Sequence, residues 1–175
     1  MLNVETMVVD ESMNPVGDGE VGEVVHRSPQ VMTAYYRNDE TTAAAFAGGW
    51  FHSGDLATVD RDGFVTIVDR KKDMINTGGE NVSSREVEEI LYGHPAVSEV
   101  AVVGVADAKW IEAVCAVVVR RDGATVTADD LIGFARERIA PFKVPKQIVF
   151  LDSLPKNPTG KILKRELRSM LGSRR

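Results

Sequence analysis

The chain has 175 residues, of which 43% are hydrophobic and 27% are charged. Fibrous and largely disordered classes are therefore excluded, and the length suits one domain or one domain with part of another. A single cysteine, Cys115, excludes a disulfide-linked scaffold and a thiolate metal cluster. The three histidines lack the spacing of metal ligands, so no metal-ligating residues are predicted. No apolar run approaches the roughly 18 residues of a membrane span, which favours a cytoplasmic protein.

Basic residues concentrate near the C-terminal end of the chain. Residues 156–175 carry seven Lys and Arg against one Glu, a net charge of +6, whereas the whole chain has −5. A basic tail on an acidic body suits an anion-binding site, a nucleic-acid arm or a feature that aids solubility. The nucleic-acid interpretation is the weakest, because the tail lacks interleaved aromatic residues and a groove-reading motif. The basic residues are Lys156, Lys161, Lys164, Arg165, Arg168, Arg174 and Arg175.

Turn-forming residues divide the first 70 residues into short elements. Asp62-Gly63 is typical of a tight hairpin between two strands. Asn38 or Asp39 is the predicted N-cap of an alanine-rich helix that ends before Gly48. The elements expected here are strands at 4–10, 22–28, 56–60 and 64–69 and a helix at 39–46.

From about residue 73 onward, amphipathic helices are interspersed with valine-rich strands. Ser83 or Ser84 with Glu86, and Thr127 with Asp130, resemble helix N-terminal caps. The valine-rich runs are too short for membrane spans and predict buried strands. The second half is therefore predicted to be α+β or α/β, with a small mixed sheet flanked by helices. The expected strands are 97–105, 113–119 and 147–151, and a last helix is expected at 162–171.

Three segments carry residues that suit chemistry. In the first, residues 49–55, Gly54 precedes Asp55 at the end of an aromatic segment. Such a carboxylate can accept hydrogen bonds from two vicinal hydroxyls, as an acidic residue does when it binds a ribose. Taken alone, Gly-Asp is more simply a turn, and His52 is more often structural than catalytic.

The second segment runs from five consecutive charged residues, 69–73, to the pair Gly78-Gly79. Charged side chains in succession are costly to bury, which predicts a solvated linker between the two halves of the chain. The paired glycines form a flexible backbone that suits either a close approach to a ligand or a plain turn.

The third segment, residues 154–165, places Lys161 after a loop that contains two prolines and Gly160. A lysine in the first turn of a helix can bind an anion together with free backbone N–H groups. The segment is not a G-x-x-x-x-G-K-[ST] phosphate loop, because Ile162 follows the lysine. Taken alone, a surface lysine at a helix start is an equally good interpretation.

In their order and spacing, the three segments resemble the C-terminal part of the adenylate-forming superfamily: acyl-CoA synthetases, luciferases and carrier-charging adenylation domains. The family patterns G-W-[FY]-x-[ST]-G-D, D-R-x-K-[DE]-x-I-x-x-G-G-E-N-V and P-x-x-x-x-G-K-x-x-[KR]-x-x-L match residues 49–55, 69–82 and 155–167. Residues that depart from those frequent in the family are Ser28, Ala34, Asn76 and Ile111.

The resemblance implies roles for residues in the nucleotide site and at the hinge. Asp55 would bind both ribose hydroxyls of ATP or AMP, and Arg70 would help to hold the ribose or phosphate side. Lys72 would be the hinge about which a C-terminal subdomain rotates between two catalytic poses.

Two further roles belong to those two poses. In the first pose, Lys161 would act as the catalytic lysine and contact the substrate carboxylate and the α-phosphate oxygens. In the second pose, the loop of Gly78, Gly79 and Glu80 would line the channel for the pantetheine arm of CoA.

The resemblance also implies a domain organisation. Residues 1–70 would be the mostly β end of the large N-terminal domain, 71–72 the hinge, and 73–175 the mobile C-terminal subdomain. The sequence contains no Ser/Thr/Gly-rich phosphate loop that ends in Pro-Lys-Gly. The chain is therefore expected to be a fragment that cannot adenylate alone and whose partner is the missing part of the N-terminal domain, which would also bind most of the Mg2+.

The expected activity is that of an ATP-dependent ligase that activates a long- or medium-chain fatty acid, or a related acid, as acyl-AMP and transfers it to CoA. The residues around Lys72 and Gly78 resemble those of the fatty-acyl and aryl-CoA branch of the family. The alternatives are an adenylation domain that charges a carrier protein and a non-catalytic nucleotide-binding or interaction module. Apolar residues of the last helix, next to basic ones, suit either packing on the sheet or peripheral contact with a membrane.

Overall fold

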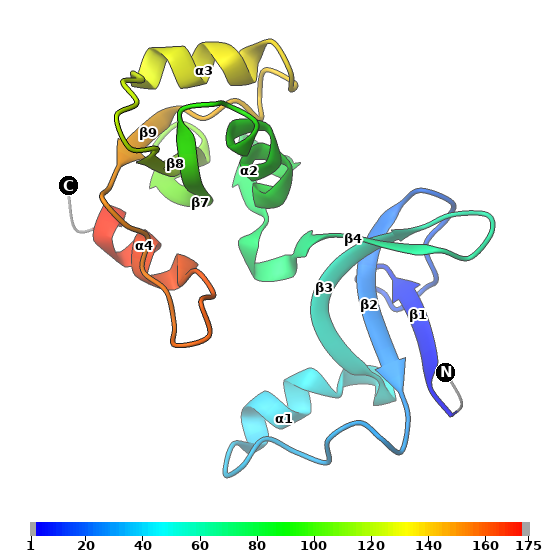
Figure 1. Ribbon diagram of the computed structural model, residues 1–175. Coiled ribbons are helices and arrows are strands. Elements are labelled where there is room, and N and C mark those ends of the chain that lie inside the picture. The colour runs from blue at the N-terminus through cyan, green and yellow to red at the C-terminus, as the bar shows by residue number, and fades with distance from the viewer. Residues whose placement is uncertain (1–2, 173–175) are drawn as a thin grey trace. The chain divides into compact units, whose positions relative to one another are not determined.

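A computed structural model describes residues 3–172 and divides the chain into two compact units, Met1–Lys72 and Asp73–Arg175 (Figure 1). Arg174 and Arg175 of the basic tail lie outside the described residues. The first unit is mostly strand, and the second combines a sheet with helices. The predicted α+β class is therefore confirmed.

The first unit is a four-stranded antiparallel sheet in the order β1-β2-β3-β4. Strands β3 and β4 form the predicted hairpin, in which Gly63 takes a φ of +83°. Asn38 caps helix α1 by accepting a hydrogen bond from the Thr41 N–H at 3.0 Å, which confirms the first of the two predicted caps. The elements are β1 (Glu5–Val9), β2 (Val21–Arg27), α1 (Asp39–Ala45), a 3-10 turn (Ala47–Gly49), β3 (Phe51–Val59) and β4 (Val65–Arg70).

The apolar core of the first unit is small. Its buried cluster consists of Val8, Val24 and Ala57, with Val16 and Val59 packed against it. Strand β4 forms one edge of the sheet and exposes the apolar residues Val65 and Ile67, and Phe64, directly before the strand, is 70% exposed. Exposed strand edges with apolar residues favour association with other strands.

The second unit contains a mixed sheet in the order β6-β5-β8-β7, with β9 parallel to β8 and the other pairs antiparallel. The short strands β5 and β6 were not predicted, because three residues are too few for an alternating pattern to show. The elements are η2 (Lys71–Asp73), β5 (Ile75–Thr77), β6 (Glu80–Val82), α2 (Ser84–Tyr92), β7 (Val97–Asp107), β8 (Ile111–Arg120), α3 (Ala128–Arg136), β9 (Gln147–Phe150) and α4 (Lys164–Gly172).

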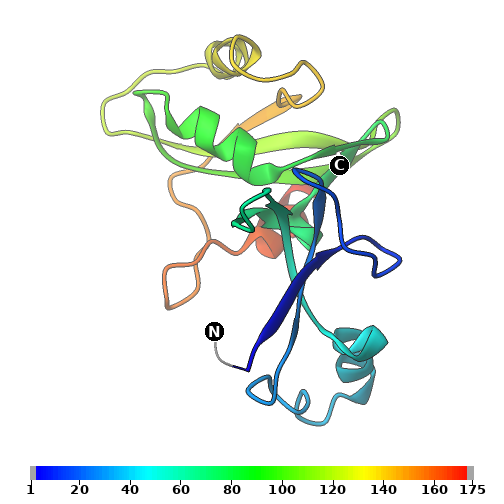
Figure 2. The ribbon, with the colours of Figure 1, turned by 90° about the vertical axis from the view of Figure 1, so that its right-hand side faces the viewer.

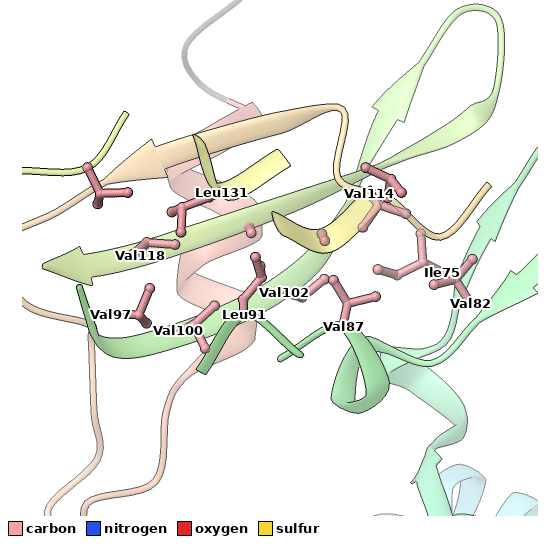
Figure 3. Close-up of a cluster of buried hydrophobic side chains, with 14 residues drawn as sticks. Ile75, Val82, Val87, Leu91, Val97, Val100, Val102, Val114, Val118 and Leu131 are labelled. Carbon is pink, nitrogen blue, oxygen red and sulfur yellow. The ribbon is translucent and has the colours of Figure 1, made fainter. Parts of the chain in front are cut away.

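The two long strands of this sheet, β7 and β8, are buried on both faces, as their valine-rich runs predict. Val100 and Val102 point to one cluster, with α2 and α3, and Figure 3 shows Val87, Leu91 and Leu131 gathered around them. Ala101 and Val103 point to the opposite cluster. This alternation follows from the two-residue period of a strand. Helices α3 and α4 lie on opposite sides of the strands (Figure 2).

The apolar side of α4 packs onto the sheet. Leu167 and Leu171 are buried in the second cluster together with Val103 and Val117, and Ile162 packs against it. Of the two interpretations of these apolar residues, the structure therefore supports packing on the sheet. Among the described residues, the helices are too short or too polar to cross a membrane.

The two predicted helix caps in this unit differ in completeness. Thr127 and Asp130 form the full reciprocal capping box of α3. Ser83 caps α2 by accepting from the Glu86 N–H at 3.3 Å. The Glu86 carboxylate binds Lys143 Nζ at 2.7 Å through both oxygens. Helix α2 is thereby tied to the loop that follows α3.

Cys115 gives a simple test of the core. It is fully buried on β8, and burial raises the pKa of its thiol to about 11. Because the thiolate is the reactive form, we expect a disulfide reagent such as Ellman's reagent to label the native chain very slowly at pH 8. In denaturing urea the single thiol should react at the rate of a free peptide. Equal rates in both conditions would contradict a buried Cys115.

Candidate active site

Asp55 lies inside a strand rather than in a turn. Gly54 and Asp55 belong to β3, so the interpretation of Gly-Asp as a turn is wrong. The pairing of β2 with β3 shifts in register here, and Gly54 takes a φ of +72°, the left-handed region that glycine tolerates. A β-bulge at Gly54 therefore sets the direction of the Asp55 side chain.

Asp55 and Arg70 lie opposite each other on β3 and β4. Arg70 Nε binds Asp55 Oδ1 at 2.5 Å, and the two side chains are 46% and 30% exposed. An ionised carboxylate has about four acceptor positions, so Asp55 can hold Arg70 and still accept from two hydroxyls. The two residues predicted for the nucleotide site are thus brought together on neighbouring strands.

Glu23, to which the sequence analysis assigned no role, lies on the neighbouring strand β2 and supports this part of β3. It is 8% exposed and accepts hydrogen bonds from the Gly54 N–H, His52 Nδ1 and Lys71 Nζ, each at 3.1 Å. Burial alone would raise the pKa of Glu23, but the hydrogen bonds from His52, Lys71 and Gly54 outweigh it and lower the pKa. In the sequence, Glu23 follows Gly22 in a predicted strand, which was only a weak signal of a functional role, because nothing in the sequence placed His52 and Lys71 beside it.

The charged run at 69–73 is only partly the solvated linker that was predicted. Lys71 and Lys72 are exposed, but Asp69 and Asp73 are 7% and 9% exposed. The interpretation is therefore wrong for the two aspartates. Their burial is possible because each has partners: the Arg70 N–H donates to Asp69 at 2.7 Å, and Arg168 binds Asp73 at 2.8 Å. Lys72 itself lies in the short 3-10 turn η2.

Gly78 and Gly79 form the tight turn between β5 and β6, with φ values of +63° and +91°. A pair of left-handed residues is the signature of a two-residue hairpin. The Gly78 N–H donates to the Trp110 carbonyl at 2.7 Å, and a Cβ on Gly78 would lie 2.9 Å from the Trp110 ring. Only glycine fits there, so Trp110 fixes the turn that carries Glu80.

Asn76, one of the departures from the family, supports the same turn. Its side-chain oxygen accepts from the Gly79 N–H at 3.2 Å, and its own N–H donates to Glu112 at 2.9 Å. Asn76 thus has a structural role in holding the turn, and it brings no positive charge to the site.

Ile111, the other departure in this unit, has a strained backbone. Its φ is +68°, which is a rare conformation for a β-branched residue, and its side chain is 65% exposed. Replacing it with glycine would relieve a strain of about 1–2 kcal/mol and lose about 0.5–1 kcal/mol to backbone entropy. We expect Ile111→Gly to raise the free energy of unfolding of the second unit by about 0.5–1 kcal/mol.

The measurement for Ile111→Gly is urea unfolding followed by the fluorescence of Trp110, in a Trp50→Phe background that silences the other tryptophan. Ile111→Ala is the matched control, since it removes the same side chain but keeps a Cβ at positive φ. An Ile111→Gly variant no more stable than Ile111→Ala would show that position 111 is not strained.

Lys161 lies in a tight loop that precedes α4, and the expectation that it occupies the first helical turn is wrong. Helix α4 starts at Lys164. Asn157 and Gly160 close a turn through a backbone bond of 2.9 Å, with Pro158 next to Asn157 and Gly160 at a φ of +84°. Asn, Pro and Gly at these places are typical of a type I turn, and the turn delays the helix.

The Asn157 side chain holds the Lys161 backbone. Its Oδ1 accepts from the Lys161 N–H at 2.8 Å and from the Thr159 N–H and hydroxyl at 3.0 and 2.8 Å. The Lys161 N–H is therefore already bonded and cannot serve an anion, contrary to the expected helix-terminus geometry. What the loop presents is the side-chain cation alone.

Three of the other cations near Lys161, though not Arg165, form ion pairs within the described part of the chain. Within residues 3–172, Lys161 is exposed and makes no ion pair. The paired neighbours, with the distances of their ion pairs, are Lys156 with Glu99 (2.5 Å), Lys164 with Glu88 (2.8 Å) and Arg168 with Asp73 (2.8 Å). Much of the charge of the basic tail is thus structural, and Lys161 remains available to an external anion.

The predicted residues form three local groups. Asp55 and Arg70 lie together in the first unit, Gly78, Gly79 and Glu80 form one turn of the second, and Lys161 stands in a separate loop of that second unit. In the part of the chain that the structure describes, no three His, Cys, Asp or Glu side chains gather to hold a metal ion.

Known proteins share both the sequence and the fold. Residues 86–161 match the family described as AMP-binding enzyme C-terminal domain. The chain is 50% identical over 161 residues to a feruloyl-CoA synthase from Amycolatopsis sp, covering 92% of this chain and 33% of that protein. It is 46% identical over 166 residues to a long-chain-fatty-acid–CoA ligase from Salmonella typhimurium, covering 95% and 29%.

The fold match includes a crystal structure of ATP-bound MatB from Rhodopseudomonas palustris, with a TM-score of 0.91 and 37% identity, covering 97% of this chain and 34% of that one. The chain thus spans about a third of the length of the relatives that it matches. Because the match extends over nearly all of these 175 residues, it includes all three segments singled out from the sequence. The chain belongs to the adenylate-forming enzymes and carries their AMP-binding C-terminal domain.

Proposed function

We propose that the protein is an ATP-dependent CoA ligase, which activates a carboxylic acid as an acyl-adenylate and transfers the acyl group to CoA. The observation that carries the proposal is the loop around Lys161, which presents this cation without an ion pair while Lys156, Lys164 and Arg168 are paired. The named relatives act on acyl substrates and on CoA, which supports the same chemistry here.

Lys161 has a clear task in the first half-reaction. The carboxylate of the substrate attacks the α-phosphate, so two anionic groups must approach each other. A cation between them stabilises the transition state more than the separated reactants. The rigid turn anchored by Asn157 supports this role, because a preorganised charge needs no rearrangement during the reaction.

Asp55 and Arg70 are proposed to hold the nucleotide. The bulge at Gly54 and the buried Glu23 on the neighbouring strand hold this part of β3 in place, which supports a fixed direction for the Asp55 carboxylate. Arg70 is close enough to contribute charge on the phosphate side of the same ligand.

The second half-reaction needs a different surface. We propose that residues 1–70 complete a larger N-terminal domain, that Lys72 in the exposed segment 71–72 is the hinge, and that residues 73–175 rotate about it. The turn of Gly78, Gly79 and Glu80 would then line the path of the CoA thiol. A Cβ on Gly79 would have no atom within 4 Å, and the open space beside this glycine leaves room for a narrow pantetheine arm.

The substrate is proposed to be a fatty acid of long or medium chain, or a related acid such as an aryl acid. The run Lys72-Asp73-Met74-Ile75 before Gly-Gly-Glu supports this branch. The two relatives described above, a feruloyl-CoA synthase and a long-chain-fatty-acid–CoA ligase, fall within the same range of acids.

The test uses the full-length natural protein with ATP, Mg2+ and a panel of acids, graded in chain length and including ferulate. Acid-dependent ATP–pyrophosphate exchange and a CoA thioester detected by mass spectrometry are the expected results. Transfer to a carrier protein but not to CoA would favour the carrier-charging alternative, and nucleotide binding without exchange would favour a non-catalytic module. The 175-residue chain alone is expected to show no exchange.

A further inference from the structure

An ion pair connects α4 with the residue that directly follows Lys72. Arg168 Nη2 binds Asp73 Oδ1 at 2.8 Å, although the two residues are 95 positions apart in the sequence. The Asp73 side chain is 13% exposed and that of Arg168 32%, so the pair is shielded from solvent on one side. Shielded pairs with a short contact resist rearrangement more than exposed ones.

Helix α4 also holds the loop of Lys161. Leu167 and Leu171 pack the helix against the sheet, and Ile162, next to Lys161, packs against the same cluster. Lys164 Nζ adds bonds to Glu88 at 2.8 Å and to Ser84 Oγ at 2.7 Å. The loop and α4 therefore form one rigid piece, and Asp73 is bound to it.

We propose that Arg168 is a positioning residue, which couples the exit of the hinge to the loop that carries Lys161. The proposal rests on the proposed function. When the backbone turns at Lys72, Asp73 moves first, and the ion pair transmits that movement to α4 directly. The turn of Gly78 needs no such link, because β5 follows Asp73 within two residues.

The coupling predicts unequal effects on the two half-reactions of the full-length enzyme. In Arg168→Gln, ATP–pyrophosphate exchange should fall about tenfold, since a small misplacement of a catalytic group costs up to about 100-fold. Thioester formation from supplied acyl-adenylate should change by less than about twofold. Arg168→Lys should regain most of the exchange rate, because it restores the charge at Asp73.

Arg165→Gln is the matched control. Arg165 lies on the same helix, is exposed, and loses the same charge without an ion pair among the described residues. We expect it to leave both half-reactions unchanged. Adding Asp73→Asn to Arg168→Gln should cost little more than either change alone, since the two residues act through one contact.

Hydrogen exchange on the 175-residue chain tests the coupling without any activity. In Arg168→Gln, the amides of Asp73 and Lys161 should exchange faster than in the wild type and in Arg165→Gln, while Val102 in β7 should not change. Unchanged exchange at Asp73 and Lys161 would overturn the proposal.

The two proposals fail in different ways. Equal losses of both half-reactions, accompanied by a lower melting temperature, would show that Arg168 is merely structural and would overturn the coupling. Half-reactions indistinguishable from those of Arg165→Gln would overturn it as well. A wild-type enzyme without either half-reaction would instead refute the proposed function, and the hydrogen-exchange result would then decide the coupling alone.

Discussion

Replacing Lys161 with alanine should reduce acid-dependent ATP–pyrophosphate exchange by the full-length enzyme about 100- to 1,000-fold, the usual cost of one preorganised transition-state charge. Thioester formation from supplied acyl-adenylate should fall by less than about threefold, because no charge develops near Lys161 in that step. The expected difference between the two half-reactions arises from the geometry, since Lys161 is exposed on a rigid turn and lies outside the apolar clusters. Single-turnover rates of the two half-reactions are the measurement.

Arg165→Ala provides a control of equal charge loss one helical position past Lys164. It should leave both rates within about twofold, because its side chain is exposed and forms no ion pair among the described residues. The melting temperature of Lys161→Ala should equal that of the wild type. If exchange by Lys161→Ala were no slower than by Arg165→Ala, the assigned role of Lys161 would be wrong.

Glu23→Gln should lower the free energy of unfolding of the first unit by about 1–3 kcal/mol at pH 7. The glutamine keeps an acceptor for the Gly54 N–H but loses the charge that His52 and Lys71 face. Most of the loss comes from the part-buried His52, because Lys71 is 55% exposed and its ion pair is screened by water. In a Trp110→Phe background, urea unfolding followed by Trp50 fluorescence reports this unit alone.

The contribution of Glu23 to the stability of the first unit should decrease at acid pH. The pKa of Glu23 lies below its ordinary value of 4.5 in the folded chain. Its stabilising effect is therefore complete above about pH 4.5 and is lost as the pH falls through the lower folded value. We expect the stability difference between wild type and Glu23→Gln to shrink as the pH falls below about 4.5.

Glu20→Gln is the control for this prediction. Glu20 is exposed and accepts from the Gly17 N–H, a bond that glutamine can replace. Its substitution should change stability by less than about 0.5 kcal/mol. A Glu23→Gln variant as stable as Glu20→Gln across this pH range would show that the buried carboxylate does not hold β3.

Local patterns in the sequence were sufficient for most of the fold. The valine-rich runs predicted the two long strands β7 and β8, Asp62-Gly63 the hairpin, and Thr127 with Asp130 the capping box, because each depends on neighbours within a few residues. The sequence also singled out Lys161, Asp55 and the Gly-Gly turn, since the order and spacing of such motifs are visible without coordinates.

Contacts between distant residues were decided only by the tertiary structure. Glu23 contacts Lys71, 48 positions away, and Asp73 contacts Arg168, 95 positions away. Without such partners, burying these carboxylates would cost too much free energy. The same reason explains why Asp73 is buried although the composition of residues 69–73 predicted exposure. Lys161 was found from its motif, but the ion pairs that neutralise Lys156, Lys164 and Arg168 join distant residues, and no local pattern in the sequence predicts them.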